Sequence, residues 1–230
     1  DFVAKNDTFQ AYVAEVADQA LTTEAADIEA FLAEESKAEA GKTVKEALDG
    51  KIAVIGENLN IRRFSKASAE DGFVASYIHA GGKIGVLVEV ATDVVNDEIK
   101  EMGKNVAMQV AAIAPKYTSR DEVSKDYIEH ETEILKVQAK NENPDKPDNI
   151  IEKMIIGRLN KELKEVCLLD QAYVKAEDGK QAVGKYVEQV AKANNANVTI
   201  KGFIRFETGE GIEKKEEDFA AEVAKQMAGN

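Results

Sequence analysis

The chain has 230 residues, of which 44% are hydrophobic, and a formal net charge of -13. This apolar fraction supports a packed core and excludes disorder over most of the length, which fits one large or two modest domains. The acidic balance opposes binding to nucleic acid or to an anionic membrane, because both carry negative charge. No apolar run could span a bilayer and no secretory signal is visible. We therefore expect a soluble cytoplasmic protein that acts by binding another protein.

The N-terminal segment predicts a short extended stretch followed by a helix. If residues 1–5 are extended, alternation sends Phe2 and Val3 to opposite sides, so that Phe2 faces outward when Val3 faces the body. Asp7 and Gln10 then resemble a capping box at the start of a helix. The apolar residues of this helix follow at helical spacing and are Phe9, Tyr12, Val13, Val16 and Ala20.

Two more helices are expected before the first strand. A short acidic helix is predicted at about 26–35, and a third helix begins at Thr43. Residues 52–64 are predicted to form a turn that includes Gly56 and leads into an extended segment at 59–63.

The middle of the chain predicts a β-hairpin and a buried helix. Residues 73–79 and 84–90 are rich in β-branched and aromatic side chains, and residues 80–83 supply a glycine-rich turn between them. Asp93 is predicted to cap the helix, and Pro115 to end it. The apolar face of this helix comprises Val95, Ile99, Met102, Val106, Val110 and Ala111.

Beyond this helix the pattern changes to two amphipathic helices. Ser119 and Glu122 resemble a capping box, and a charged helix runs to about Lys140. Residues 141–148 hold two of the three prolines and mark a turn. The apolar stripe of the return helix comprises Ile151, Met154, Ile155, Leu159 and Leu163. The pair is typical of an antiparallel helical hairpin that projects from the body.

The C-terminal part predicts mixed structure. A helix carries Val183, Val187 and Val190, two strands follow at 198–200 and 203–207, and Asp218 caps a final helix. Helices mixed with hairpin-like strands, without a repeating strand-helix-strand order, favour an α+β fold with antiparallel sheets.

The residues that could carry chemistry are sparse. Two histidines and the single Cys167 are too few for a zinc site of usual spacing, and no phosphate-binding loop occurs. Cys167 lies among apolar residues, which favours an inert buried thiol, and His130 lies on a charged helix face. The acidic residues sit mostly at solvent-facing positions. We therefore expect no catalytic residues, no metal and no cofactor.

Two residues keep alternative interpretations on pattern alone. His79 ends a predicted strand where the turn begins, so it is either a structural turn residue or a side chain that reaches a partner. Phe2 is either part of the core or an exposed aromatic anchor of the kind that dominates interfaces.

Several sequence blocks occur in order along nearly the whole chain, at residues 1–5, 55–63, 77–88, 106–112, 202–207, 211–214 and 218–223. Each block alone is weak, but together they are specific. They resemble the elongation factor Ts family, the bacterial exchange factors for elongation factor Tu.

The resemblance implies roles for particular residues. Asp1 and Phe2 match the exchange motif that intrudes beside the Mg²⁺ ion and switch region of the GTPase. Ile55, Gly56 and His79 match further contacts with the GTPase. The helical hairpin matches the family's dimerisation or docking element.

The resemblance also implies a domain organisation: α+β, with two subdomains that have small antiparallel sheets packed by helices, plus the projecting hairpin. The N-terminal core subdomain is expected at 1–70, the C-terminal core subdomain at 71–117 and 167–201, the hairpin at 118–166 and a C-terminal module at 202–230. The family's N-terminal three-helix module should precede Asp1, and we expect this chain to lack it as a fragment of a longer protein.

The function implied is that of a bacterial cytoplasmic translation factor, which binds elongation factor Tu and promotes GDP release by disturbing its Mg²⁺ and phosphate site. Neither nucleic acid nor a membrane is an expected direct partner, and a homodimer or a 2:2 complex with the GTPase is left open. The alternative is a truncated docking module that binds the GTPase without efficient exchange. An enzyme that uses carboxylates would need a converging acidic pocket.

Overall fold

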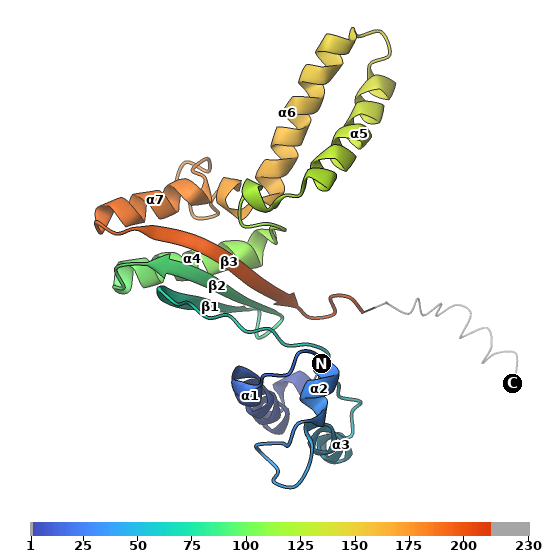
Figure 1. Cartoon of the computed structure of the whole chain (residues 1–230), viewed down its shortest axis with the longest axis vertical. Coiled ribbons are helices and arrows are strands. Elements are labelled where there is room, and N and C mark those ends of the chain that lie inside the picture. The colour runs from blue at the N-terminus through green and yellow to red at the C-terminus, as the bar shows by residue number, and fades with distance from the viewer. Residues whose placement is uncertain (1, 213–230) are drawn as a thin grey trace, which may run out of the picture. The chain divides into compact units, whose positions relative to one another are not determined.

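The computed structural model describes residues 2–212, so Asp1, the final helix expected at Asp218 and most of the C-terminal module lie outside the described residues. The chain divides into two units, Asp1–Ala67 and Ser68–Asn230 (Figure 1). The α+β class with an antiparallel sheet is confirmed. We expected a small sheet in each subdomain, but strand pairing within residues 2–67 is limited to one bridge, between Glu35 and Thr43.

The first unit is helical. It contains the 3-10 turn η1 (Val3–Lys5) and the helices α1 (Asp7–Thr22), α2 (Ile28–Ala33) and α3 (Val44–Ile55). Its core joins all three helices and the extended segment after them, through Ala20, Phe31, Val44, Val16, Ile28, Leu32, Ile61 and Phe64. The Phe31 and Phe64 rings are 4.9 Å apart between centroids, so the extended segment closes the core.

Two expected helix ends in the first unit are wrong. Asn6, not Asp7, caps α1, because its side chain accepts hydrogen bonds from the Thr8 and Phe9 backbone amides. The turn expected from residue 52 is helical as far as Ile55, and only then does Gly56 end α3 in a left-handed conformation, with φ of 78°. The apolar residues of α3 continue up to that glycine, so its position was the better signal.

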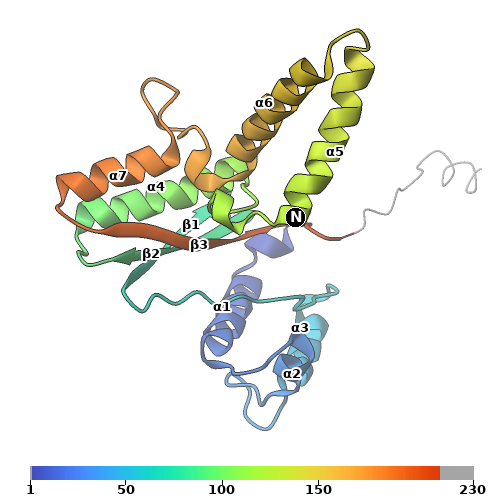
Figure 2. The same cartoon turned by 45° about the horizontal axis from the view of Figure 1, so that its top comes forward.

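The second unit is built on one antiparallel sheet of β1 (Gly72–His79), β2 (Ile84–Thr92) and β3 (Val198–Glu207), in that order. The helices α4 (Asp97–Ile113) and α7 (Val183–Ala193) cover the same face of the sheet (Figure 2). The core between them includes Val86, Val88, Val90, Ile99, Met102, Val106, Val110, Val183 and Ile200. The expected β-hairpin and the expected buried face of α4 are confirmed, except that Val95 is half exposed.

The two strands expected at 198–200 and 203–207 form one continuous strand. The pairing shifts between Glu89↔Gly202 and Val90↔Ile200, which leaves Lys201 as an extra residue in a β-bulge. The bulge reverses the alternation, so that Ile200 and Phe203 both pack against the core although they are three residues apart. The boundary that we expected before residue 202 therefore falls inside β3, and residues 202–207 belong to the sheet.

The start of α4 also differs from the expectation. Asn96 caps this helix and accepts a hydrogen bond of 2.9 Å from the Ile99 amide. Asp93 instead accepts hydrogen bonds from the backbone and side chain of Asn197, which hold the pKa of its carboxyl below the ordinary value. Asp93 thus joins the two loops that precede α4 and β3.

The expected helical hairpin is present as α5 (Lys125–Glu142) and α6 (Asp148–Val166), and it projects from the sheet and its helices (Figure 1). Its start was placed too early, because Ser119 caps only the short turn η2 (Arg120–Glu122) and Ser124 caps α5. The distal part has its own core, formed by Ala139, Ile151, Ile155, Leu135 and Met154. A separate cluster at the base contains Val123, Leu163 and Cys167.

The base of the hairpin is tied to the body through backbone hydrogen bonds. The Lys116 amide donates to the Val166 carbonyl, and the Leu168 amide donates to the Tyr117 carbonyl, each at 2.8 Å. The short turn η3 (Leu168–Asp170) then leads to α7. These bonds lie outside residues 124–163, and the distal part of the hairpin packs in its own cluster. The distal hairpin is therefore not part of the core of the body.

Removal of residues 135–155, with residues 134 and 156 joined by a short glycine-rich loop, should leave the body folded, because the base cluster stays complete. We expect the main thermal transition, followed by circular dichroism, to shift by only a few degrees. A matched deletion of residues 124–163 removes Leu163 from the base cluster and should lower that transition further. Equal loss of the whole fold in both variants would contradict the separation of the two clusters.

Candidate functional site

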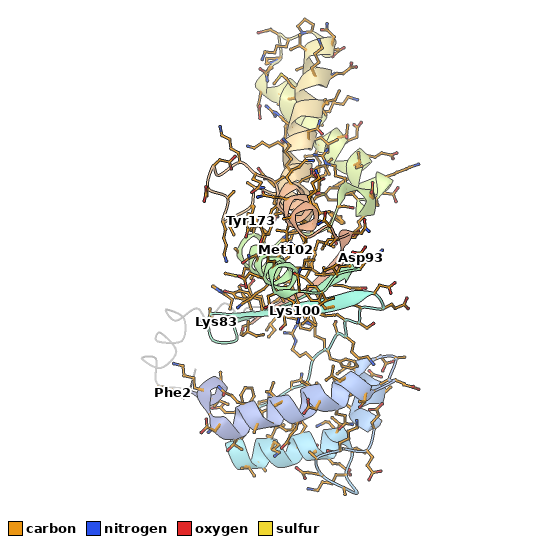
Figure 3. All side chains as sticks on the ribbon, turned by 90° about the vertical axis from the view of Figure 1, so that its left-hand side faces the viewer. Phe2, Lys83, Asp93, Lys100, Met102 and Tyr173 are labelled. Carbon is orange, nitrogen blue, oxygen red and sulfur yellow. The ribbon has the colours of Figure 1, made fainter. Side chains whose placement is uncertain are left out.

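Phe2 is the most exposed of the large apolar side chains that the structure describes, at 96% of its full accessible area (Figure 3). The extended segment expected at residues 1–5 is wrong, because Val3–Lys5 form a 3-10 turn in which the Lys5 amide donates to the Phe2 carbonyl at 3.2 Å. The outward direction of Phe2 therefore comes from the turn and not from strand alternation. Its exposure favours the anchor interpretation over the core interpretation. Asp1 lies outside the described residues.

Ile55 and Gly56 form the C-terminal end of α3. The Gly56 amide donates to the Ile52 carbonyl at 2.8 Å, and its left-handed φ of 78° is unfavourable for a residue with a side chain. Among residues 2–212, no atom beyond the two chain neighbours lies within 4 Å of a Cβ built on Gly56. Glycine is therefore required by the backbone conformation and not by crowding. Ile55 is half-buried, whereas the preceding Val54 is 76% exposed.

His79 is the exposed last residue of β1, at the tip of the β-hairpin. Three consecutive residues with positive φ follow it: Ala80 at 49°, Gly81 at 66° and Gly82 at 96°. The Gly82 and Lys83 amides both donate to the His79 carbonyl at 3.1 Å. The Tyr77 hydroxyl lies 2.9 Å from Nδ1 of His79.

The third strand braces this tip. Ile84 pairs with His79 on one side and with Glu207 on the other. The Thr208 amide and hydroxyl both donate to the Lys83 carbonyl, at 2.9 and 3.0 Å. The turn that carries His79 is therefore fixed by hydrogen bonds from two directions, and His79 presents its ring from a rigid position.

The predicted contact residues are divided between the two units. Phe2, Ile55 and Gly56 belong to the first unit, and His79 belongs to the second. Sequence reasoning did not single out two exposed apolar neighbours, Val54 beside Ile55 and Ile78 beside His79, the latter 66% exposed. Helical periodicity gave no signal for Val54, because it lies seven residues after the buried Ala47 and so on nearly the same side of α3. Its exposure is visible only in the structure.

The described residues contain few features suited to catalysis. Within residues 2–212, no group of three or more His, Cys, Asp or Glu side chains is arranged to hold a metal ion. Cys167 is buried, which raises the pKa of its thiol and disfavours the reactive thiolate. No described helix is long and apolar enough to cross a membrane.

One groove of about 450 Å³ between α4 and α7 carries three carboxylates, those of Asp97, Glu98 and Glu101. Asp97 and Glu98 lie in the first turn of α4, where negative charge stabilises the positive end of the helix dipole. Glu98 also accepts a hydrogen bond of 2.9 Å from the Asn194 side chain. Helix stabilisation therefore accounts for two of the three acids without a catalytic role.

Comparison with known proteins gives one family. The family model described as elongation factor TS matches residues 1–210. Elongation factor Ts from Clostridioides difficile (strain 630) is 53% identical over 227 residues, which are 99% of this chain and 73% of the relative. Elongation factor Ts from Clostridium botulinum (strain Eklund 17B / Type B) is 48% identical over the same shares. The corresponding protein of Trichlorobacter lovleyi is 49% identical over 97% of this chain and 72% of the relative.

Gly56→Ala should lower the free energy of unfolding by about 1 kcal/mol, because alanine is strained at a positive φ. Gly157→Ala is the matched control: Gly157 lies inside α6, and outside its own helix backbone and chain neighbours no described atom lies within 4 Å of an added Cβ. There alanine should stabilise by about 0.5–1 kcal/mol through its helix propensity. Urea denaturation measures both, and a Gly56 variant as stable as the parent chain would contradict the conformational requirement.

Proposed function

The chain belongs to the elongation factor Ts family, and we propose that it acts as a guanine nucleotide exchange factor for elongation factor Tu. The observation that carries this proposal is the family match over residues 1–210, with 53% identity to the Clostridioides difficile protein. On this proposal the chain works in the cytoplasm of a bacterium and has no catalytic centre of its own.

The physical requirement for exchange is differential binding. An exchange protein that binds the nucleotide-free GTPase more tightly than the GDP-bound form must weaken the affinity for GDP by the same ratio, because coupling between two sites is reciprocal. Such a factor needs no nucleophile and no general base. It needs contacts that exist only when the nucleotide site is disturbed.

Phe2 is the strongest candidate for such a contact. We assign Asp1 and Phe2 to the exchange motif that disturbs the Mg²⁺ and phosphate site of the GTPase. Because 96% of the Phe2 side chain is accessible in the free chain, nearly all of its apolar surface remains to be buried on binding. Full burial of a phenylalanine side chain contributes about 1.5–3 kcal/mol.

Ile55, Gly56 and His79 are proposed as further contacts with the GTPase. Each lies where an element ends: Ile55 and Gly56 at the end of α3, and His79 at the end of β1. Residues at such positions reach a partner while the rigid element behind them fixes their position. The exposed Val54 adjoins Ile55 and would enlarge the apolar area of that contact.

The helical hairpin is proposed as a docking or dimerisation element, in a homodimer or in a 2:2 complex with the GTPase. Its distal part exposes several large apolar side chains, which are Ile134, Val137, Ile150 and Ile156. Exposed apolar residues gathered on a projecting element favour contact with another protein. We propose a functional division into core subdomains at 1–70 and at 71–117 with 167–201, the hairpin at 118–166 and a C-terminal module at 202–230, whose residues 202–207 also complete strand β3.

The chain should accelerate the release of labelled GDP from elongation factor Tu, and Phe2→Ala should reduce this effect strongly. Truncation of an interface anchor costs about 2 kcal/mol or more, or about thirtyfold in affinity for the nucleotide-free GTPase. The melting temperature should stay nearly unchanged. Leu21→Ala is the matched control, since Leu21 is a 69% exposed apolar residue of α1 with no assigned contact.

Three outcomes would count against these assignments. Tight binding without faster GDP release would make the chain a docking module. A large fall in melting temperature with normal exchange would place Phe2 in the core. Equal losses of exchange in Phe2→Ala and Leu21→Ala would show that the effect is not specific to the exchange motif.

A further inference from the structure

Tyr77 and His79 are neighbours on one face of the sheet. They are two residues apart on β1, so their side chains point to the same side, while Ile78 points to the other. Tyr77 is half-buried and packs against the core beneath α4, whereas His79 is exposed. The two ring centroids are 5.8 Å apart, and the Tyr77 hydroxyl lies 2.9 Å from Nδ1 of His79. The hydroxyl thus connects an anchored ring to an exposed one.

The direction of this hydrogen bond follows from the two groups. A phenol is a good donor, while its oxygen is a poor acceptor because its lone pairs are delocalised into the ring. The unprotonated nitrogen of a neutral imidazole is a strong acceptor. The favoured arrangement has the Tyr77 hydroxyl donating to Nδ1 of His79. The single N–H proton of the neutral imidazole then resides on Nε2.

The backbone of His79 is already fixed by its strand pairing with Ile84 and by the two amides that donate to its carbonyl. The remaining freedom lies in the two side-chain torsions of the imidazole. A hydrogen bond from an anchored tyrosine restricts both torsions and selects the tautomer. A side chain ordered in advance loses less entropy on binding.

We propose that Tyr77 is a positioning residue that holds His79 in the Nε2–H tautomer, so that His79 offers an N–H donor to an acceptor oxygen of the GTPase. The partner in this inference rests on the proposed function. The tautomer does not, because it concerns the free chain alone.

Imidazole nitrogen NMR tests the tautomer directly. The chain has only two histidines, His79 and His130, so the ¹⁵N-labelled spectrum is readily assigned, with the exposed His130 on α5 as the internal reference. The spectrum is recorded at mildly alkaline pH. His79 should show Nδ1 as an acceptor and Nε2 as protonated. Tyr77→Phe, which removes only the hydroxyl, should move His79 toward the tautomer mixture of His130, and an unchanged His79 would overturn the positioning role.

Exchange kinetics test the donor. The side-chain amide of glutamine places its NH₂ near the position of Nε2, whereas that of asparagine reaches only the position of Nδ1. His79→Gln should therefore keep most of the GDP-release activity, while His79→Asn and His79→Ala should both lose about tenfold, the expected loss for one interfacial hydrogen bond to a neutral donor. Tyr77→Phe should lower exchange severalfold with an unchanged melting temperature.

The two parts fail separately. Equal exchange by the glutamine and asparagine variants would overturn the donor assignment. If the parent chain itself did not accelerate GDP release, the proposed function would fail, while the NMR result would still decide the tautomer.

Discussion

The close packing of α4 against the sheet is the interaction on which the second unit depends. Ile99, Met102, Val106 and Val110 have no exposed surface, and they face the equally buried Val88 and Val90 of β2. At Gly103 the approach is closest, since an added Cβ would lie 2.9 Å from the Phe73 ring. A larger residue there would require the Phe73 ring or the helix to shift. Because α4 packs against one face of the sheet, it fixes the strands, and the positions of the strand ends and turns follow from them.

This packing explains why a turn of three residues with positive φ can present a side chain reliably. Backbone conformations of this kind persist only where the surrounding structure determines them. Here β1 is anchored by α4, and β3 returns to bind the turn through Thr208 and Lys83. Phe2 represents the opposite arrangement. It stands before a single 3-10 turn, in which the Lys5 amide donates to the Phe2 carbonyl, and not at the end of a paired strand.

The sequence predicted the elements better than their ends. Four elements could be located because each gives a repeated or conformationally specific signal. They are the helices α4, α6 and α7, with their apolar stripes, and the glycine-rich turn after His79. The N-cap residues were less predictable. Asn6, Asn96 and Ser124 each have an acidic or hydroxyl residue nearby that could also cap the helix, and tertiary contacts decide which residue does so. The single strand β3 was missed, since a bulge reverses the alternation on which strand prediction relies.

The candidate site was predictable in a different way. Composition and spacing left Phe2 and His79 open between a structural and a binding role, and the resemblance to a family supplied the roles. The exposure of Phe2 and the rigid tip around His79 are three-dimensional facts. No periodicity in one sequence encodes them. The contact between Tyr77 and His79 belongs to the same class, because spacing put both residues on one face but only geometry joined the hydroxyl to the ring.

The position of Cys167 allows local unfolding at the base of the hairpin to be measured without adding a label site. This thiol is the only one in the sequence, and it is fully buried where α6 passes into η3, within the base cluster of the hairpin. A thiol reagent can reach it only when that junction opens. Its labelling rate, compared with that of an unfolded chain, would report the free energy of separating the hairpin from the body. A GTPase partner that stabilises the hairpin against the body would lower the labelling rate of Cys167, and one that moves the hairpin away from the body would raise it.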